Sequence, residues 1–188
     1  MSDDRFHMLG IAGSLRAASF NRGLLRAAAE LVPPGVTFST FDIRDLPHYD
    51  ADIQTHGDPP IVEDLKRQVI QADALLFATP EYNYSVPGVL KNAVDWASRP
   101  PKTCCLRGKA AGIVGASSGE SGTMRAQLAL RQSFVFTGTL AMVQPEFRLP
   151  RAGEVCDETG LLVDAEQRER LRAYLVALVE WARLVASP

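Results

Sequence analysis

Hydroxyl, guanidinium and amide side chains are concentrated in one short stretch, Gly13 to Asn21, between an apolar run and a predicted helix. The first N–H groups of a helix have no partner within it and carry the positive end of its dipole, so they suit a phosphate. Ser14, Ser19 and Asn21 can donate to phosphate oxygens, and Arg16 can add charge-assisted bonds. Ser19 or Asn21 can also cap the helix, but a cap alone does not require so many polar groups. We therefore predict a phosphate site here.

The kind of phosphate follows from the motifs that this stretch lacks. Residues 10–15 miss the third glycine of the dinucleotide fingerprint Gly-x-Gly-x-x-Gly, and only Asp42 is a candidate for the acidic residue that ends the second strand. The chain contains no Gly-Lys-Ser or Gly-Lys-Thr, which a nucleoside triphosphate loop requires. A mononucleotide phosphate therefore fits better than a dinucleotide or a triphosphate.

A second polar stretch, Pro80 to Gly88, combines two tyrosines and an asparagine with two prolines. It predicts a stiff wall with polar tips, suited to a planar heteroaromatic ring whose heteroatoms bind Asn83 and backbone N–H groups. The alternative is a rigid turn whose Tyr82 and Tyr84 cover the sheet edge. Glu81 has no nearby partner for acid–base catalysis, so we expect it to brace the loop.

A third stretch, Gly115 to Gly122, consists almost entirely of glycine, alanine and serine. Small residues allow the backbone to approach a bound ring or ribityl chain closely, and the hydroxyls can cap the next helix. Taken alone, a glycine–serine turn is common and indicates little.

Apolar runs and amphipathic stretches alternate along the chain, and they predict the elements that position the three loops. We expect strands at 6–12, 36–42, 74–79, 110–116 and 140–143, and helices at 21–31, 61–72, about 89–96, 123–134 and 165–185, with a long connection at 46–60. This alternation predicts a parallel α/β sheet with helices on both faces. Ligands of such sheets bind beyond the carboxyl ends of the strands, where the three loops fall. We expect one domain over residues 1–188.

Composition restricts the classes of function. Among 188 residues, the net charge of −2 and the absence of Lys/Arg runs argue against a nucleic acid partner and an anionic membrane surface. The acidic start, Met1 to Arg5, is unlike a signal peptide, and no apolar stretch approaches the ~18 residues of a membrane span, so we expect a cytoplasmic protein.

The cysteines and histidines do not predict a metal site. The three cysteines, Cys104, Cys105 and Cys156, lack the spacing of metal ligands, and the three histidines share no helix-face spacing with one another or with the cysteines. The adjacent Cys104 and Cys105 could form a redox dithiol, but ordinary thiols are the expectation in a reducing cytosol.

Taken together, the three loops resemble the NADPH-dependent FMN reductase family, which includes bacterial quinone and chromate reductases. The matching residues are Gly13–Arg16 with Ser19–Asn21, Pro80–Trp96, and Gly115–Gly119 with Arg125–Gln127 and Leu130–Gln132. One departure is Thr123, where relatives commonly have a second glycine after Gly122.

The resemblance implies a flavodoxin-like three-layer αβα sandwich with a five-stranded parallel sheet, order 2-1-3-4-5, and non-covalently bound FMN. It implies that the phosphate lies on the first loop and the isoalloxazine ring against the second. The residues implied to bind the cofactor are Ser14, Arg16, Ser19, Phe20, Asn21, Pro80, Glu81, Tyr82, Asn83 and Ser117. A homodimer or homotetramer is also implied.

The activity implied is a ping-pong reductase. NADPH or NADH passes a hydride to the flavin N5, and a small acceptor (a quinone, free flavin, an azo compound or an oxyanion such as chromate) is then reduced. Because the flavin carries this chemistry, no catalytic side chain and no metal are expected. The alternatives are a flavodoxin-type electron carrier, which the low net charge does not favour, and an FMN-binding regulatory protein.

Three further side chains have two interpretations each. Tyr49 either borders the pocket or is an exposed loop aromatic. Arg125 and Arg131 either steer the phosphates of NADPH or are solvated helix charges.

Overall fold

The computed structural model describes residues 6–186. Residues 1–5, on which the expectation about a signal peptide rests, lie outside the described residues. The strands are β1 (Phe6–Ala12), β2 (Val36–Phe41), β3 (Ala74–Ala78), β4 (Ala110–Ala116), β5 (Leu140–Ala141) and β6 (Phe147–Leu149). The helices are α1 (Phe20–Leu31), α2 (Ala51–Thr55), α3 (Pro60–Gln71), α4 (Gly88–Ala97), α5 (Met124–Thr137) and α6 (Ala165–Ala186), with short 3-10 turns at Pro101–Thr103 and Ala152–Glu154.

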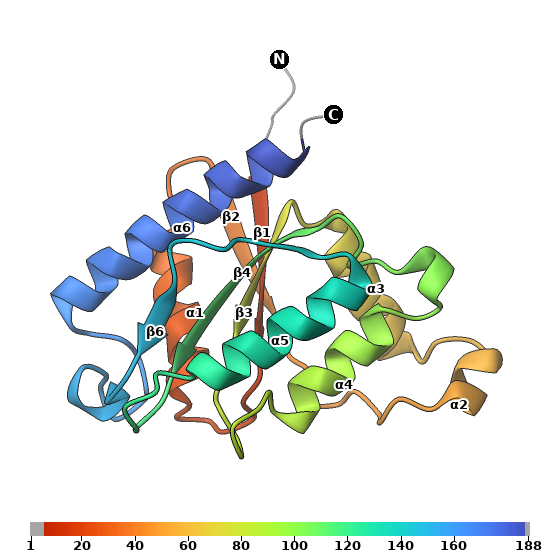
Figure 1. Ribbon diagram of the computed structural model, residues 1–188, viewed down its shortest axis with the longest axis horizontal. Helices are drawn as coiled ribbons and strands as arrows, with labels where there is room; N and C mark the ends of the chain where they lie inside the picture. Colours follow the sequence, from red (N-terminus) through yellow and green to blue (C-terminus); the bar gives the residue numbers. More distant parts are fainter. Residues whose placement is uncertain (1–5, 187–188) are drawn as a thin grey trace.

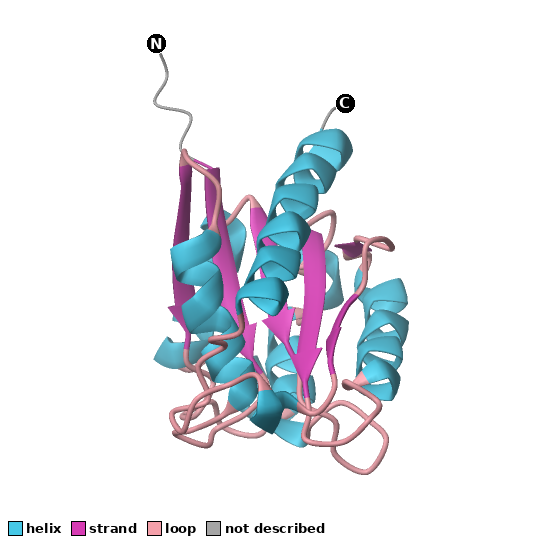
Figure 2. Ribbon diagram, turned by 90° about the vertical axis from the view of Figure 1, so that its left-hand side faces the viewer, coloured by secondary structure: helices cyan, strands magenta, loops and turns pink. Residues whose placement is uncertain are grey.

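The strands form one parallel sheet in the order β2-β1-β3-β4-β5, which confirms the predicted order. Helices α1 and α6 cover one face, and α3, α4 and α5 cover the other (Figures 1 and 2). Alternate residues of the central strands therefore enter two separate cores. In β3, Leu76 packs with α1 and α6, whereas Leu75 and Phe77 pack with the opposite layer.

Strand burial follows position in the sheet. The continuous apolar runs of β3 and β4 are fully buried, as expected for central strands with helices on both faces. β2, whose sequence alternates, is half-buried at the sheet edge. One of its faces is only partly covered by α1, and a pocket remains between the two elements.

The fifth position of the sheet is divided, so the prediction of one strand at 140–143 was incomplete. β5 pairs with the start of β4, and β6 pairs with the end of β4 after the chain has left the sheet edge. Pro145 lies in the intervening segment and has no N–H to donate to a ladder, which explains the interruption.

The long connection at 46–60 contains the short helix α2, which was not predicted. None of its five residues is buried, so it lacks the apolar periodicity that would reveal it. The chain before it is held to α4, because the carbonyl of Pro47 accepts hydrogen bonds from Asn92 Nδ2 and Trp96 Nε1, both at 2.8 Å.

The ends of the described chain lie far from the three loops. β1 begins at Phe6 and α6 ends at Ala186, both at the end of the sheet opposite the loops that follow β1, β3 and β4 (Figure 1). Over residues 6–186, no helix has both the length and the apolar character to cross a membrane.

Candidate functional site

The three loops meet at the carboxyl end of the sheet and line one pocket of about 160 Å³. Nine of the ten residues implied to bind the cofactor line it: Ser14, Arg16, Ser19, Phe20, Asn21, Pro80, Glu81, Tyr82 and Ser117. Ala116 and Ser118 complete the lining, while Asn83 lies outside it. The structure therefore brings nine of the ten residues together in one pocket. That they bind FMN stays a prediction.

The first loop presents helix N–H groups and a free cation to the pocket. Ser19 is the N-cap of α1, and its side chain accepts a weak hydrogen bond from Arg22 N at 3.3 Å. The earlier N–H groups of the first turn have no intrahelical acceptor by geometry. Arg16 donates to the carbonyl of Ala18 at 2.8 Å and forms no ion pair within residues 6–186. Capping by Ser19 thus leaves N–H groups and the Arg16 guanidinium available to an anion in this loop.

Asn21 has a role that its sequence position did not reveal. It is 2% exposed, and its side chain donates to Ala116 O (2.9 Å) and accepts from Ala116 N (3.0 Å). Both amide atoms bond the last residue of β4. The side chain of Asn21 therefore fixes the first loop against the third, and this leaves one N–H of its amide and its backbone N–H as possible donors to a phosphate.

The second loop is a miniature hairpin. Tyr82 and Ser85 exchange two backbone hydrogen bonds, at 3.1 and 3.0 Å. Asn83 and Tyr84 between them have φ of 51° and 63°, as the central residues of a type I′ turn do. Asn83 therefore sits at the tip of the turn. A left-handed tyrosine costs about 1–2 kcal/mol, and such strain is concentrated at functional sites.

Glu81 braces the loop, as expected, and does so by capping a helix. Its buried carboxylate accepts hydrogen bonds from Arg125 N (2.9 Å) and Ala126 N (3.3 Å) at the start of α5. Arg125 Nη1 (3.0 Å) and Ser121 Oγ (3.4 Å) also bind it. Thr123, the N-cap residue of α5, makes no side-chain cap, so Glu81 takes that place and joins the second loop to the third.

The two arginines proposed for NADPH have protein partners. Arg125 pairs with Glu81, and its guanidinium lies 4.1 Å from the ring centroid of Tyr84. Arg131 donates to the carbonyl of Met142 at 2.8 Å. Tyr49 does not line the pocket; it packs edge-on against Trp96 at 5.0 Å. Arg125 is thus part of the loop framework.

The third loop is supported by the chain around β6. Ser117 donates from its backbone to Leu149 O (3.1 Å) and accepts from Ala152 N (2.9 Å). Thr123 is fully buried with φ of 69°, a conformation that favours glycine. A Cβ on Gly115 would lie 1.7 Å from Thr123 Oγ1, so Gly115 makes room for this threonine.

The cysteines lie apart from the pocket. Cys104 and Cys105 are half-buried against the core formed with α3, α4 and α5. Burial raises the pKa of the Cys105 thiol to about 12, which keeps it protonated at neutral pH. No cluster of three or more metal-ligating side chains occurs within residues 6–186.

Comparison with known proteins gives the family. The family model for NADPH-dependent FMN reductase matches residues 6–154. The chain is 49% identical to an NAD(P)H-dependent FMN reductase of Pseudomonas aeruginosa, covering 97% of this chain and 98% of the relative. It is 45% identical to an NAD(P)H:quinone oxidoreductase of Solanum tuberosum, covering 90% and 89%.

Among solved structures, the flavoenzyme NAD(P)H:acceptor oxidoreductase FerB of Paracoccus denitrificans superimposes with a TM-score of 0.86 at 34% identity. The match covers 95% of this chain and 97% of FerB. Sequence and fold agree over nearly the full length. The chain belongs to the NADPH-dependent FMN reductase family.

Proposed function

We propose that this chain, a flavin oxidoreductase by family, oxidises NAD(P)H and reduces quinones with FMN held in the pocket of the three loops. The observation that carries the proposal is the convergence of nine predicted residues on one pocket at the carboxyl end of the sheet. FMN, when bound, supplies the group that accepts and donates a hydride.

The residues have distinct tasks in this proposal. The N–H groups at the start of α1, with Ser14, Ser19 and Arg16, hold the flavin phosphate. Pro80 and Tyr82 flank the ring system, and Asn83 at the hairpin tip reads its heteroatoms. The pocket of about 160 Å³ is below the ~300–1,000 Å³ usual for ligand sites, so the ring lies partly over the open rim.

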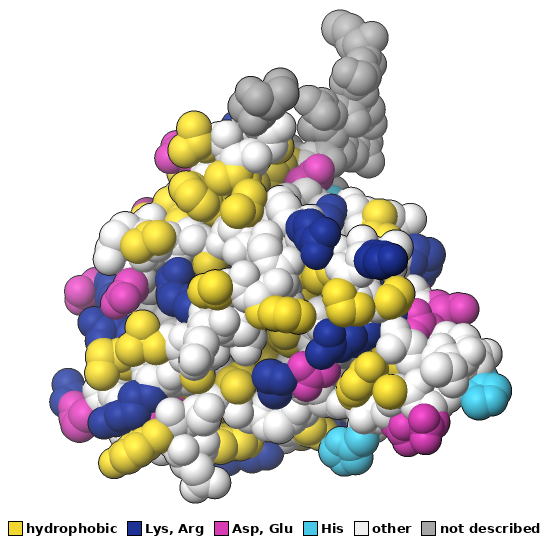
Figure 3. Space-filling model, turned by 45° about the vertical axis from the view of Figure 1, so that its right-hand side comes forward, with side chains coloured by type: hydrophobic (Ala, Val, Ile, Leu, Met, Phe, Trp, Pro, Cys, Tyr) yellow, Lys and Arg dark blue, Asp and Glu magenta, His cyan; other side chains and the backbone are white. Residues whose placement is uncertain are grey.

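Quinones are the acceptor that the relatives favour, since an NAD(P)H:quinone oxidoreductase is 45% identical to this chain. Free flavin, azo compounds and oxyanions such as chromate are further candidates for the same open rim. An electron carrier would dock to other proteins through a strongly charged surface. Figure 3 instead shows hydrophobic, basic and acidic side chains of the described residues interspersed on the face in view, with no extended patch of a single charge among them.

We place the protein in the cytoplasm and propose a homo-oligomer. The support for assembly is a row of exposed apolar side chains on α5. Leu128, Val135 and Phe136 are 57%, 84% and 68% exposed. Apolar side chains gathered in this way favour a protein contact over water. Size-exclusion chromatography of Val135→Glu against the parent chain tests this, with a smaller species expected for the variant.

The decisive experiment begins with an absorption spectrum of the purified protein and of the supernatant after heating. We expect a flavin spectrum and release of free FMN. The holoprotein should then oxidise NADPH or NADH in the presence of a benzoquinone, and removal of FMN should abolish this. Normal FMN uptake without turnover would instead favour a carrier or a regulatory protein.

A further inference from the structure

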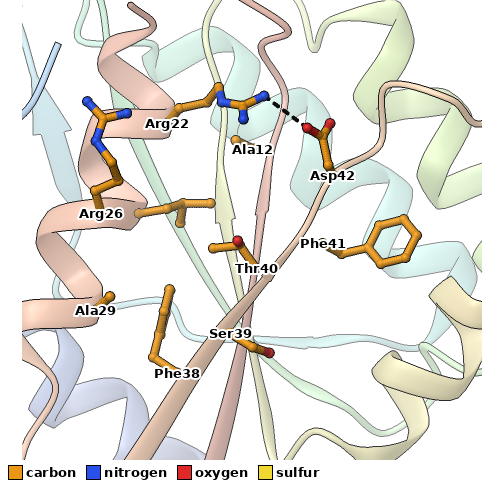
Figure 4. A pocket seen from close by; sticks show the side chains of 10 residues that line it. Ala12, Arg22, Arg26, Ala29, Phe38, Ser39, Thr40, Phe41 and Asp42 are labelled. Atoms are coloured by element: carbon orange, nitrogen blue, oxygen red, sulfur yellow. Dashed lines mark hydrogen bonds and ion pairs between the residues drawn. The ribbon is translucent and has the colours of Figure 1, made fainter. Parts of the chain in front are cut away.

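A second pocket, larger than the one at the three loops, lies between α1 and β2. Its volume is about 300 Å³. It is lined by the end of β1, one side of α1 and most of β2: Ala12, Arg22, Leu25, Arg26, Ala29, Phe38, Ser39, Thr40, Phe41 and Asp42. Figure 4 shows Arg22, Arg26 and Asp42 at one end, with Phe38 and Ser39 at the other. We call this pocket the α1–β2 groove.

Two positive charges of the groove lie where they do not stabilise helix α1. Arg22 and Arg26 are spaced i, i+4 on α1, where like charges repel, and Arg22 lies in the first turn, where the helix dipole is positive. The first turn of α1 holds no acidic residue. Asp42 pairs with Arg22 and offsets part of this repulsion, and a bound phosphate would offset more of it.

Their protein partners leave both guanidinium groups with free donors. Arg26 donates to Thr159 O at 2.8 Å and to Thr159 Oγ1 at 3.4 Å. The pKa of Asp157 is lowered by the hydrogen bond from the Thr159 side chain, and the charge of Arg26 also helps to lower it. Arg22 reaches Asp42 through one nitrogen at 3.2 Å, and this pair is exposed to solvent. A guanidinium has five N–H groups, so each side chain can bind a phosphate without losing these contacts.

The floor of the groove is apolar. Leu25 and Phe38 provide a flat hydrophobic surface, and Ala29 keeps the slot open because its side chain is only a methyl group. An apolar slot with cations at one end suits a planar base that carries a phosphate. The volume is at the lower limit of about 300–1,000 Å³ for ligand pockets, which matches a mononucleotide and not a whole dinucleotide.

The groove and the three-loop pocket are neighbours on α1. Ser19, Phe20 and Asn21 line the three-loop pocket, and Arg22, the next residue, lines the groove. A dinucleotide whose nicotinamide occupies the open rim of the first pocket can therefore extend around the first turn of α1 into the second.

We propose that the α1–β2 groove binds the adenosine end of NADPH, with its 2′-phosphate at Arg22 and Arg26 and its adenine over Leu25 and Phe38. The identity of the nucleotide rests on the proposed function. The recognition of a phosphorylated nucleoside rests on the groove alone. Because NADH lacks the 2′-phosphate, the groove favours NADPH.

Binding of adenosine 2′,5′-bisphosphate to the FMN-loaded protein tests this by calorimetry. Arg26→Ala removes one cation, Ala29→Trp fills the slot from an exposed helix position, and Arg172→Ala on α6 removes an exposed charge elsewhere as the matched control. We expect Arg26→Ala to weaken binding about tenfold or more through loss of a charged hydrogen bond, and Ala29→Trp to weaken it at least as much by occupying the slot. The control should bind like the parent chain.

Steady-state kinetics with the two nicotinamides complete the test. Arg26→Ala should raise KM for NADPH about tenfold and leave KM for NADH nearly unchanged, whereas Ala29→Trp should raise both. The proposal is overturned if the parent chain reduces quinones but does not bind the bisphosphate, or if both variants bind it normally. Bisphosphate binding in a protein without reductase activity would support the groove and reject the proposed function.

Discussion

Glu81 stabilises a helix whose first turn lies forty-four residues further along the chain. Its carboxylate replaces the N-cap side chain that Thr123 fails to provide, and it places a negative charge at the positive end of α5. Since the same residue belongs to the hairpin loop beside the pocket, one side chain sets the spacing of two walls of the site.

The first prediction concerns this carboxylate. Glu81→Ala should lower the free energy of unfolding by about 2–4 kcal/mol, because N–H groups at the start of α5 and the Arg125 guanidinium lose their acceptor. Glu81→Gln keeps one acceptor oxygen and should cost about half as much. Urea unfolding of the apoprotein measures both.

FMN titration by fluorescence quenching distinguishes a role of Glu81 in positioning the loops from its contribution to the stability of the fold. Glu81→Ala should weaken FMN binding about tenfold or more, because the two walls separate, while Glu81→Gln should stay close to the parent chain. The exposed Glu158→Gln serves as the control. Equal affinities for all three variants would rule out a positioning role.

A second residue-scale prediction follows from the raised pKa of Cys105. Its thiol has an ordinary pKa of 9.0 in the unfolded chain and about 12 in the fold, mainly because burial disfavours the thiolate. Between these values the unfolded state has lost the proton and the folded state has kept it. Stability therefore falls as pH rises above 9.0, by up to about 1.4 kcal/mol per pH unit.

Cys105→Ala should reduce this alkaline loss. The free energy of unfolding, measured at about pH 8, 9 and 10, should fall less steeply in the variant than in the parent chain. Cys156, whose pKa is raised to about 11 by burial, contributes its own part and remains in both proteins. Parallel slopes would contradict the assignment.

At the scale of elements, two asparagines hold pieces of chain that no regular structure connects. Asn21 of α1 bonds both backbone groups of Ala116 at the end of β4. Asn92 of α4 bonds Pro47 O and Tyr49 N, both at 2.8 Å, in the connection before α2. Each asparagine side chain thus satisfies backbone groups that lie outside regular helix or sheet pairing.

These two residues form a matched pair for the third prediction. Asn21→Ala and Asn92→Ala should each destabilise the fold by about 1–3 kcal/mol, with the larger effect at the buried Asn21. Only Asn21→Ala should also weaken FMN binding, because Ala116 lines the three-loop pocket. Unfolding curves and FMN titrations on both variants check the difference; equal loss of affinity in both would refute it.

The sequence predicts those elements that have a strong apolar pattern. β3 and β4 follow from continuous apolar runs, and α1 and α6 from buried stripes. It does not predict α2, which buries nothing, or β6, which has three residues.

The candidate site, too, could be predicted from the sequence only in part. The polar residue types of the first two loops predicted a shared pocket, because parallel strands end at one edge. The capping of α5 by Glu81 and the clamp at Asn21 depend on contacts with residues 40 to 95 positions away. Nothing in local spacing indicates such contacts. The α1–β2 groove likewise depends on how closely the helix approaches the edge strand.

For the whole molecule, the two cores on opposite faces of the sheet both contact the strands that lead to the loops. We therefore expect a ligand bound to these loops to raise the free energy of unfolding of the whole domain. With free FMN at a hundredfold excess over its dissociation constant, we expect a gain of about 2.7 kcal/mol.

This gain is the fourth prediction. For a chain of this size it corresponds to a rise in Tm of roughly 5–11 °C between apoprotein and holoprotein. Thermal unfolding followed by circular dichroism, with riboflavin as the comparison, measures it. Riboflavin lacks the phosphate, so a rise as large as that with FMN would contradict a phosphate site on the first loop.

The position of Phe6 and Ala186, opposite the loops, has a practical consequence. A fusion partner or a tether to a solid support joined at either terminus leaves the loop end facing outward. Nicotinamides and electron acceptors then reach it from the bulk solution. The protein is therefore suited to oriented attachment on electrodes or beads through the chain that leads to Phe6 or follows Ala186, without permuting its elements.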